Sequence, residues 1–389
     1  MRSENVLLAA LAATAPTLST AATCTSHTIK VQATANNRVI FAPGSDLTSV
    51  SGVESLLSSG AGLLGQLAGF FPVSGTYDIA AEYCQPAPGS PLSRHRDVQL
   101  LLHGVPYDKS YWFGLPGNPD GSEKYNWVEY ATSQGYPVLA IDNLGAGAST
   151  KANPITEVQQ PLQLAILHEI TTKLRKGELE FAPAAEKVIF VGHSLASVTG
   201  NGIATKYPSD FNTMILTGYS NALVEAGLGL LLTELEPAQT QNPAKFNDLP
   251  PGYLAFGSSQ GKRNSYYAED GTFSASLAEY DFAHQDTITL GQILTAFSGL
   301  QKADAYKGDV LVLTGSEDAF FCGPTGTRAV GPQTCGVGDD SIPAKSRSFF
   351  PNAHFDYYLA PNTSHATTLH YSTPGSIRRA HEFLAESGY

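Results

Sequence analysis

Five short apolar runs, separated by turns and helical patterns, constrain the fold of this chain more than any other feature of its sequence. An alternating segment at residues 76–83 precedes them, and the runs themselves lie at residues 98–104, 136–142, 187–194, 211–219 and 309–315. Continuous apolar runs of this length are typical of strands buried on both faces of a sheet. Residues 158–176 repeat apolar side chains at a helical period, and residues 195–206 also read as a helix. The pattern predicts an α/β fold, with a mostly parallel sheet covered by helices on both faces.

Residues 222–308 interrupt this alternation between two of the predicted strands. They begin with an apolar stretch, continue with a proline-rich part and carry several aromatic residues. Ligands of open parallel sheets bind beyond the carboxyl ends of the strands, so an insertion at this place covers the pocket. We therefore expect four parts: a leader at 1–22, a core at 23–221, an inserted cap at 222–308 and the rest of the core at 309–389.

The N-terminus has the pattern of a secretory signal peptide. Arg2 precedes a ten-residue apolar run at 6–15, and small residues follow up to Ala21 and Ala22. The run is too short to span a bilayer, and no other stretch is long and apolar enough to do so. We expect cleavage near Ala21 or Ala22 and a secreted protein without a stable membrane anchor.

The cysteines agree with an oxidising compartment. Cys24, Cys84, Cys322 and Cys335 form an even set, for which two disulfides are the natural interpretation outside the cytosol. The sequence leaves their pairing open, although a bond from Cys322 to Cys335 would close a short loop. Asn362 begins the sequon Asn-Thr-Ser, which predicts a glycosylation site.

Ser194 is the predicted nucleophile. It lies in Gly-His-Ser-Leu-Ala, between an apolar strand and a helix, where a sharp elbow requires small residues two positions on either side. Ser259 matches the stricter Gly-x-Ser-x-Gly pattern, but it lies inside the expected cap with no helical period after it, which favours a turn. Ser220 ends a strand without a following helix, and we interpret it as a residue that lines the pocket.

A serine nucleophile needs a histidine base and an acid that orients the histidine. Glu317 and Asp318 follow the last predicted strand, and Asp318 is preferred because it suits the loop. His365 is the preferred histidine, with His370 and His354 as alternatives. The order Ser194, Asp318, His365 is the order expected for this topology.

The turn after the first predicted parallel strand reads His-Gly-Val-Pro. A tight turn there can aim the Val105 amide, together with the Leu195 amide, at an oxyanion that develops on the substrate. The glycine-rich segment 142–149 lacks the spacing of a dinucleotide or phosphate loop, and we interpret it as scaffolding. No histidine or cysteine cluster has the spacing of a metal site, so no metal and no cofactor are expected.

Taken together, these motifs resemble the α/β-hydrolase superfamily. The resemblance rests on HGVP (103–106), IDNLGAGAS (141–149), VGHSLA (191–196), LTGSED (313–318) and TSH (363–365), and it covers about residues 75–389 without the cap. Relatives with the His-Gly-x-Pro turn include enzymes with an aspartate nucleophile, whereas this chain has a serine there. The resemblance implies ester, lactone or related acyl chemistry, with Ser194 attacking the carbonyl, His365 moving the proton, Asp318 orienting it, and the Val105 and Leu195 amides holding the oxyanion.

Composition narrows the choice of partner. The 23 Lys and Arg against 35 Asp and Glu give a net charge of −12, which argues against nucleic acid and anionic membranes. The apolar cap and the nearly uncharged segment 44–73 favour a hydrophobic, uncharged ester or lactone. That segment could be a loosely helical flap or a surface-binding element, but a covered loop is the preferred interpretation. A peptide or a biosynthetic intermediate as substrate, or a binding protein on the same scaffold, are the alternative functions, and the sequence indicates no oligomeric state.

Overall fold

The structure is a computed structural model that describes residues 22–41, 45–58, 67–86, 89–222, 234–322 and 335–389. Eight strands form one twisted sheet in the order β1-β2-β4-β3-β5-β6-β10-β11. Strands β1 and β2 pair antiparallel, β2 pairs antiparallel with β4, and the remaining neighbours are parallel. The strands are β1 (Thr23–Ile40), β2 (Leu67–Gln85), β3 (Asp97–Leu102), β4 (Val138–Ile141), β5 (Lys187–His193), β6 (Thr213–Thr217), β10 (Asp309–Gly315) and β11 (His354–Ala360).

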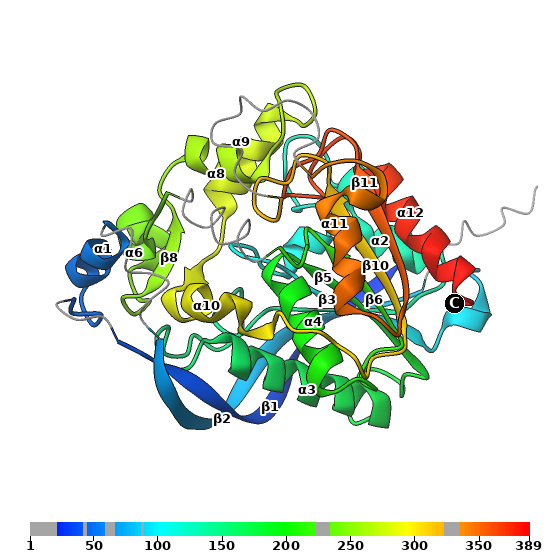
Figure 1. Ribbon diagram of the computed structural model, residues 1–389, viewed down its shortest axis with the longest axis horizontal. Helices are drawn as coiled ribbons and strands as arrows, with labels where there is room; N and C mark the ends of the chain where they lie inside the picture. Colours follow the sequence, from blue (N-terminus) through cyan, green and yellow to red (C-terminus); the bar gives the residue numbers. More distant parts are fainter. Residues whose placement is uncertain (1–21, 42–44, 59–66, 87–88, 223–233, 323–334) are drawn as a thin grey trace, which may run out of the picture.

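Helices cover both faces of this sheet, as Figure 1 shows. On one face lie α3 (Gln160–Lys176) and α4 (Leu195–Lys206), and on the other lie α2 (Trp127–Ser133) and α12 (Thr373–Glu386). The short helix α11 (Ile342–Lys345) packs beside β11. Single helical turns complete this part: η1 (Leu92–Arg94), η2 (Lys109–Trp112), η3 (Glu123–Tyr125), η5 (Gly338–Asp340) and η6 (Ser346–Phe349). The predicted fold class is confirmed.

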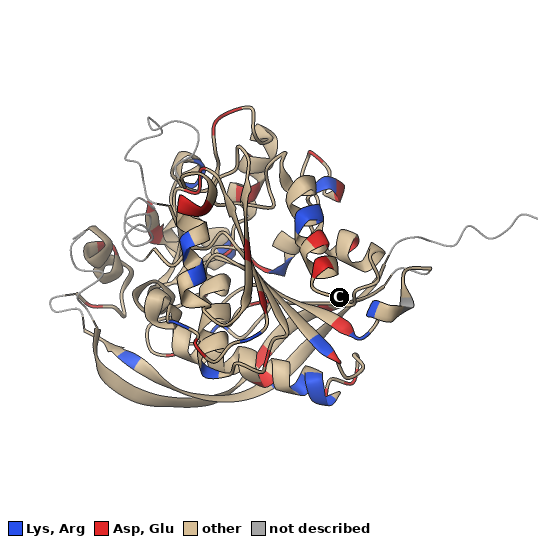
Figure 2. Cartoon of the chain, turned by 45° about the vertical axis from the view of Figure 1, so that its right-hand side comes forward, with Lys and Arg blue, Asp and Glu red and all other residues tan. Residues whose placement is uncertain are grey.

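Alternate residues of the central strands build the two cores. In β10, Val310 and Val312 pack with α3 and α4, whereas Leu311 and Leu313 pack with α2 and α12. All four side chains are at most 1% exposed. A strand must be apolar throughout when both of its faces are covered, and for this reason the strands appear as continuous runs in the sequence. Figure 2 shows the consequence, because the charged residues lie mostly on the outer helices, the loops and the ends of the strands.

A second group of elements lies between β6 and β10, outside the main sheet. It contains a three-stranded sheet of β7 (Leu235–Pro237), β8 (Tyr253–Phe256) and β9 (Ile288–Thr289). Its helices are α6 (Ala238–Gln241), α7 (Pro243–Phe246), α8 (Ser259–Tyr266), α9 (Ala275–His284), α10 (Leu290–Thr295) and the turn η4 (Ala296–Gly299). We refer to these elements as the cap. The boundaries expected at 222 and 308 stay a prediction, and residues 223–233 lie outside the described residues.

The N-terminal third differs from the sequence expectation. The described parts of 44–73, residues 45–58 and 67–73, are not a covered loop, because they contain α1 (Val50–Ser58) and the beginning of β2. Strand β2 pairs with β1 along almost its whole length and forms a long two-stranded ribbon, whose far end lies beside the cap (Figure 1). Helix α1 packs on the cap through Val53 and Leu56. The described residues of this segment thus belong to the main sheet, through β2, and to the elements that pack on the cap, through α1.

Two disulfides use all four cysteines. Cys24 bonds to Cys84, which is its direct partner in the β1–β2 register, and Cys322 bonds to Cys335. The expectation of two disulfides is confirmed, and the structure supplies the pairing that the sequence left open. Among the described residues, no helix combines the length and the apolar character that crossing a bilayer requires. The predicted leader lies outside the described residues, apart from Ala22.

The two disulfides should differ in their contribution to stability. They join residues 60 and 13 positions apart, and the entropy model assigns about 4 kcal/mol to the longer loop and about 3 kcal/mol to the shorter one. Urea unfolding should therefore show a larger loss of stability for the double variant Cys24→Ser/Cys84→Ser than for Cys322→Ser/Cys335→Ser. If reductant leaves the unfolding midpoint of the parent protein unchanged, the disulfides do not form in solution.

Candidate active site

Ser194 lies at the sharp turn between β5 and α4. Its backbone has φ 56° and ψ −119°, a conformation that is strained for any residue with a side chain. The turn leaves no room for a larger neighbour, because a Cβ at Gly192 would lie 2.9 Å from the amide nitrogen of Ser197. Ala196 fits without difficulty and is 1% exposed. The substitution of alanine for the usual glycine is therefore compatible with the elbow.

The structure brings Ser194, His365 and Asp318 together from three separate loops. The Nε2 atom of His365 lies 2.7 Å from Ser194 Oγ, and Nδ1 lies 3.0 Å from Asp318 Oδ2. An ionised carboxylate only accepts hydrogen bonds, so Nδ1–H of His365 donates to Asp318 and Nε2 accepts from the Ser194 hydroxyl. The exposed fractions are 4% for Ser194 and 0% for His365 and Asp318. This chain of hydrogen bonds can remove a proton from the serine during an attack on a carbonyl carbon.

Backbone amides hold the carboxylate of Asp318 in place. Its second oxygen accepts hydrogen bonds from the N–H groups of Phe320 and Phe321, both at 2.9 Å. Within the described part of the chain, Glu317, the alternative acid, forms neither a hydrogen bond nor an ion pair with His365. Burial and the nearby Glu269 carboxylate raise the pKa of Glu317. The geometry thus favours Asp318 over Glu317.

The other candidate histidines have structural partners. His370 Nδ1 lies 2.8 Å from the carbonyl of Ala366, and its Nε2 accepts from the amide of Ala268 at 3.1 Å. His354 is exposed on β11 and lies 3.0 Å from a carboxylate oxygen of Asp309. Neither contacts Ser194, so His365 is the histidine that the fold delivers to the elbow.

The other candidate serines are engaged elsewhere. Ser259 opens helix α8 and donates a hydrogen bond to Glu279 at 2.7 Å, so the turn expected at this position is wrong. The hydroxyl of Ser258 caps that helix by accepting from the amide of Gly261. Ser220 is fully buried and donates to the carbonyl of Phe321 at 2.7 Å. Of the three candidate serines, Ser194 alone has a histidine within hydrogen-bonding distance in the described part of the chain.

The loops that carry the two amides expected to hold an oxyanion approach each other at Ser194. Within the described residues, neither Val105 N–H nor Leu195 N–H donates a hydrogen bond to a protein acceptor. The Leu195 amide is free because it is the first residue of α4. Gly104 allows the Val105 loop to approach, since a Cβ there would lie 2.8 Å from Ser194 Cβ and 2.9 Å from the His193 carbonyl oxygen. Two unpaired donors therefore adjoin the serine, as an oxyanion hole requires.

The glycine-rich segment 142–149 is joined by hydrogen bonds to the loop that follows β3. Asp142 accepts from the amide and the ammonium group of Lys109 and from the amide of Ala148. His103 Nε2 accepts from the amide of Asn143 at 3.0 Å. These hydrogen bonds join the ends of β3 and β4, which agrees with a scaffolding role. Within the described residues, no group of three histidine, cysteine or acidic side chains could hold a metal ion.

Aromatic rings surround His365. The rings of Phe320 and Tyr266 lie 4.9 and 5.0 Å from its ring, Phe320 stacked and Tyr266 edge-on. The hydroxyl of Tyr266, which is 2% exposed, donates to the carbonyl of Val105. A residue of the cap thus contacts both the base and the oxyanion loop. The sequence marked Tyr266 only as one aromatic residue of the cap, and no motif connects it to the site.

A buried ion pair anchors the cap helix that carries Tyr266. Lys262 Nζ lies 2.8 Å from Asp281 Oδ1, and both side chains are 1% exposed. The other carboxylate oxygen of Asp281 accepts from the hydroxyls of Tyr267 at 2.8 Å and Tyr107 at 3.3 Å. Since removing one partner of a buried pair leaves an uncompensated charge, this network fixes α8 against α9 and against the loop after β3.

Residues 99–380 match the family model that is described as "Alpha/beta hydrolase family". That span covers most of the chain and includes Ser194, Asp318 and His365. The chain belongs to the alpha/beta hydrolase family. No curated protein sequence matches this hydrolase.

Solved structures of other proteins are similar to this chain. A thermophilic esterase from Thermogutta terrifontis has a TM-score of 0.51 at 14% identity, covering 81% of this chain and 96% of that one. An esterase of Pyrococcus furiosus has a TM-score of 0.44 at 12% identity, with coverages of 80% and 87%. A deformylase of N-formylmaleamic acid from Pseudomonas putida has a TM-score of 0.43 at 14% identity, with coverages of 76% and 94%.

Buried histidines should make this hydrolase sensitive to acid. Burial lowers the pKa of His370 and of His381 to about 4, and burial together with His365 lowers that of His193 well below 6.5. A lowered pKa means that the unfolded state binds more protons, so stability falls as the pH drops from about 6.5 towards 4. His381→Gln should reduce the loss of unfolding free energy between pH 7 and pH 5 by about 2 kcal/mol, measured by urea unfolding. An identical loss in variant and parent would contradict the burial of a neutral His381.

Proposed function

We propose that this protein is a secreted serine hydrolase that cleaves an ester or lactone of a hydrophobic, uncharged substrate through an acyl-enzyme. One observation carries the proposal: a buried serine on a strained elbow lies 2.7 Å from a histidine that is itself 3.0 Å from a carboxylate. Such a chain of hydrogen bonds activates a hydroxyl that is otherwise a weak nucleophile.

Acylation begins when Ser194 Oγ attacks the carbonyl carbon and its proton passes to Nε2 of His365. The carbonyl oxygen gains the negative charge and accepts hydrogen bonds from the Val105 and Leu195 amides, each worth about 3 kcal/mol in the transition state. Asp318 stabilises the imidazolium through Nδ1–H. The tetrahedral intermediate then collapses, the carbon–oxygen bond to the alcohol breaks, and His365 returns the proton to the leaving oxygen.

Deacylation repeats these steps with water. His365 takes a proton from the water, the hydroxide attacks the acyl carbon, and Ser194 leaves with the proton returned from His365. The products are a carboxylic acid and an alcohol, which stay joined as a hydroxy acid when the substrate is a lactone.

The surroundings of the two amides support an apolar substrate. The side chain of Val105 belongs to an apolar cluster with Val53 of α1 and Leu254 and Ile288 of the cap, and the side chain of Leu195 packs against it. A charged acyl group at this place would lose its hydration without a partner. Helix α1 and the cap thus provide an apolar wall that favours uncharged substrates.

The disulfides support secretion, since structural disulfides persist in oxidising compartments. Asn362 is exposed at the end of β11, three residues before His365, where a glycan could be attached. The signal peptide at 1–22 and glycosylation at Asn362 stay predictions.

A fluorophosphonate probe tests the nucleophile directly. The purified mature protein should be labelled at Ser194, and Ser194→Ala should not be labelled and should lose turnover of p-nitrophenyl esters while keeping its unfolding curve. Ser220→Ala is the matched control, because that buried serine has no histidine partner, and it should still be labelled. Esters of increasing chain length and a lactone would then measure the size of the acyl pocket.

The outcomes separate the alternatives. Labelling without turnover of any ester or lactone would favour a peptide or a biosynthetic intermediate as substrate. Absence of labelling would favour a binding protein on the same fold, and full activity of Ser194→Ala would contradict the assignment of the nucleophile.

Tyr266 should act as a positioning residue for the oxyanion loop. Tyr266→Phe removes the hydrogen bond to the Val105 carbonyl, worth about 1 kcal/mol, and should lower kcat roughly fivefold with little change in KM. Tyr253→Phe is the matched control, since it removes a buried hydroxyl of the cap that donates to the carbonyl of Ala152 at 2.7 Å, away from Ser194. Equal effects of both variants on kcat would show that Tyr266 only stabilises the cap.

A further inference from the structure

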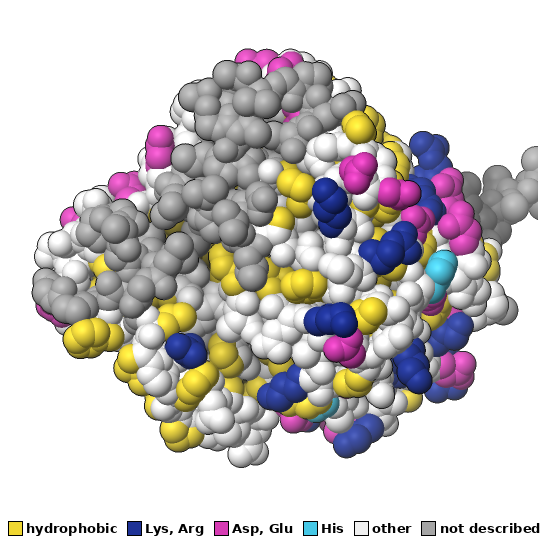
Figure 3. All heavy atoms as spheres, viewed as in Figure 1, with side chains coloured by type: hydrophobic (Ala, Val, Ile, Leu, Met, Phe, Trp, Pro, Cys, Tyr) yellow, Lys and Arg dark blue, Asp and Glu magenta, His cyan; other side chains and the backbone are white. Residues whose placement is uncertain are grey.

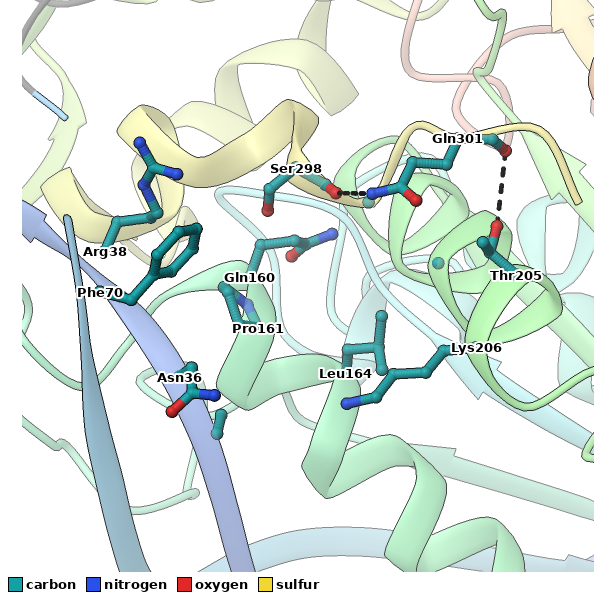
Figure 4. A pocket seen from close by; sticks show the side chains of 13 residues that line it. Asn36, Arg38, Phe70, Gln160, Pro161, Leu164, Thr205, Lys206, Ser298 and Gln301 are labelled. Atoms are coloured by element: carbon teal, nitrogen blue, oxygen red, sulfur yellow. Dashed lines mark hydrogen bonds between the residues drawn. The ribbon is translucent and has the colours of Figure 1, made fainter. Parts of the chain in front are cut away.

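A groove of about 690 Å³ lies outside the site of Ser194, between the β1–β2 ribbon, the start of α3, the end of α4 and the turn η4. Figure 1 shows these elements on the face towards the viewer, and Figure 4 shows the groove from close by. It contacts α4 at Gly202, Thr205 and Lys206, which are about 10 to 16 Å along the helix from Leu195. Its volume is in the range of small-molecule sites.

We propose that this groove binds an anionic amphiphile, a carboxylate that carries an unbranched apolar chain. The site is separate from the proposed catalytic centre, and its occupation does not depend on the proposed reaction. Three features of the groove carry the inference: its apolar floor, its two cations and the exposed aromatic ring at its edge.

Apolar side chains form the floor of the groove. Ala35 and Leu164 are each 8% exposed and line it together with the ring of Pro161. The helices approach so closely beneath them that a Cβ at Gly202 would lie 2.5 Å from Leu164 Cδ1 and 3.4 Å from the Cα of Gly299. An apolar chain laid along these three side chains would remove apolar surface from water on both sides of the contact.

The charge of the groove is one-sided. Arg38 and Lys206 line it, and among the described residues no Asp or Glu does. Within the described residues neither cation takes part in an ion pair, and Arg38 Nε is buried without a hydrogen-bond partner. On the face shown in Figure 3, by contrast, basic and acidic side chains are interspersed on the right-hand side. Lys206 Nζ lies 5.1 Å from the centre of the Tyr207 ring. Two cations without a carboxylate partner among the described residues, in a protein with net charge −12, provide a local attraction for an anion.

Phe70 completes the groove from the ribbon side. Its side chain is 65% exposed, and the guanidinium carbon of Arg38 lies 4.4 Å from the centre of its ring. Figure 4 shows Arg38 and Phe70 at one end, whereas Lys206 reaches in from the opposite side below Leu164. A large exposed aromatic residue costs solvation free energy, and an apolar chain laid against it would cover it. The anionic head is expected beside Arg38 or Lys206, with the chain on Leu164 and Phe70.

The test uses the full mature chain with Ser194→Ala, so that turnover does not contribute and failure of the proposed function leaves this result interpretable. Decanoate below its critical micelle concentration is titrated in a calorimeter at low ionic strength. We expect one molecule to bind in the groove, and we expect Arg38→Gln/Lys206→Gln to weaken this binding at least tenfold. Lys30→Gln/Lys307→Gln is the matched control, because it removes two exposed cations outside the groove, and it should leave the affinity within twofold.

Two further arms test the shape and the charge of the site. Asn36→Trp fills the groove from an exposed position of β1 and should abolish binding, whereas Gln32→Trp, exposed on the same strand but outside the groove, should not. Decanol should bind at least tenfold more weakly than decanoate. Unchanged binding in Asn36→Trp or in the double glutamine variant would overturn the proposal, as would equal binding of decanol. Binding to phosphatidylglycerol vesicles without binding of free decanoate would replace it with attachment to a lipid surface.

Discussion

The strained turn at Ser194 is the constraint on which the rest of the site depends. A residue with a side chain holds a conformation with positive φ only when its surroundings leave no alternative. At Ser194, these surroundings are β5, α4 and the neighbouring loops. Gly192 and Gly104 let backbone approach the turn from two sides. The parallel sheet places the ends of β3, β5, β6 and β10 at one edge, where Val105, Ser194 and Asp318 follow their strands. The loop with His365 follows β11 at the same edge.

The cap and helix α1, which lies between the two strands of the ribbon in the sequence, both pack over this edge of the sheet, but with different kinds of contact. The cap reaches the site with polar and aromatic groups, through the Tyr266 hydroxyl on Val105 and the Lys262–Asp281 pair behind it. Helix α1 contributes an apolar contact through Val53. The Cys24–Cys84 disulfide holds the base of the ribbon. The side chains of Ser194, His365 and Asp318 are buried, whereas Phe70 at the edge of the separate groove is largely exposed.

The sequence predicted the strands that are buried on both faces, and it missed several elements that are exposed on one side. Strands β3, β5 and β10 are continuous apolar runs and lie where they were expected. Strand β1 was missed because its buried positions alternate with exposed polar ones and include small residues such as Ala33 and Ala35. Helix α8 was missed because the side chain that it buries most deeply is Lys262, and its partner Asp281 lies on another helix, so no apolar period marks it.

The candidate triad was visible because each member directly follows a strand or a short sequence motif. The contact between Tyr266 and Val105 was not, because it joins residues 161 positions apart without a local pattern. The same holds for the disulfide pairing, which the β1–β2 register decides.

The amides proposed to hold the oxyanion belong to Val105 and Leu195, whose side chains form part of the apolar wall. The donors are main-chain groups, so their chemistry does not depend on which side chain either residue carries. Exchanging valine for alanine or isoleucine would reshape the wall and leave the donors in place. Substrate preference and chemical competence are thus separable in this architecture, and the side chains of Val105 and Leu195 can change the acyl preference without changing the main-chain amides that we propose as oxyanion donors.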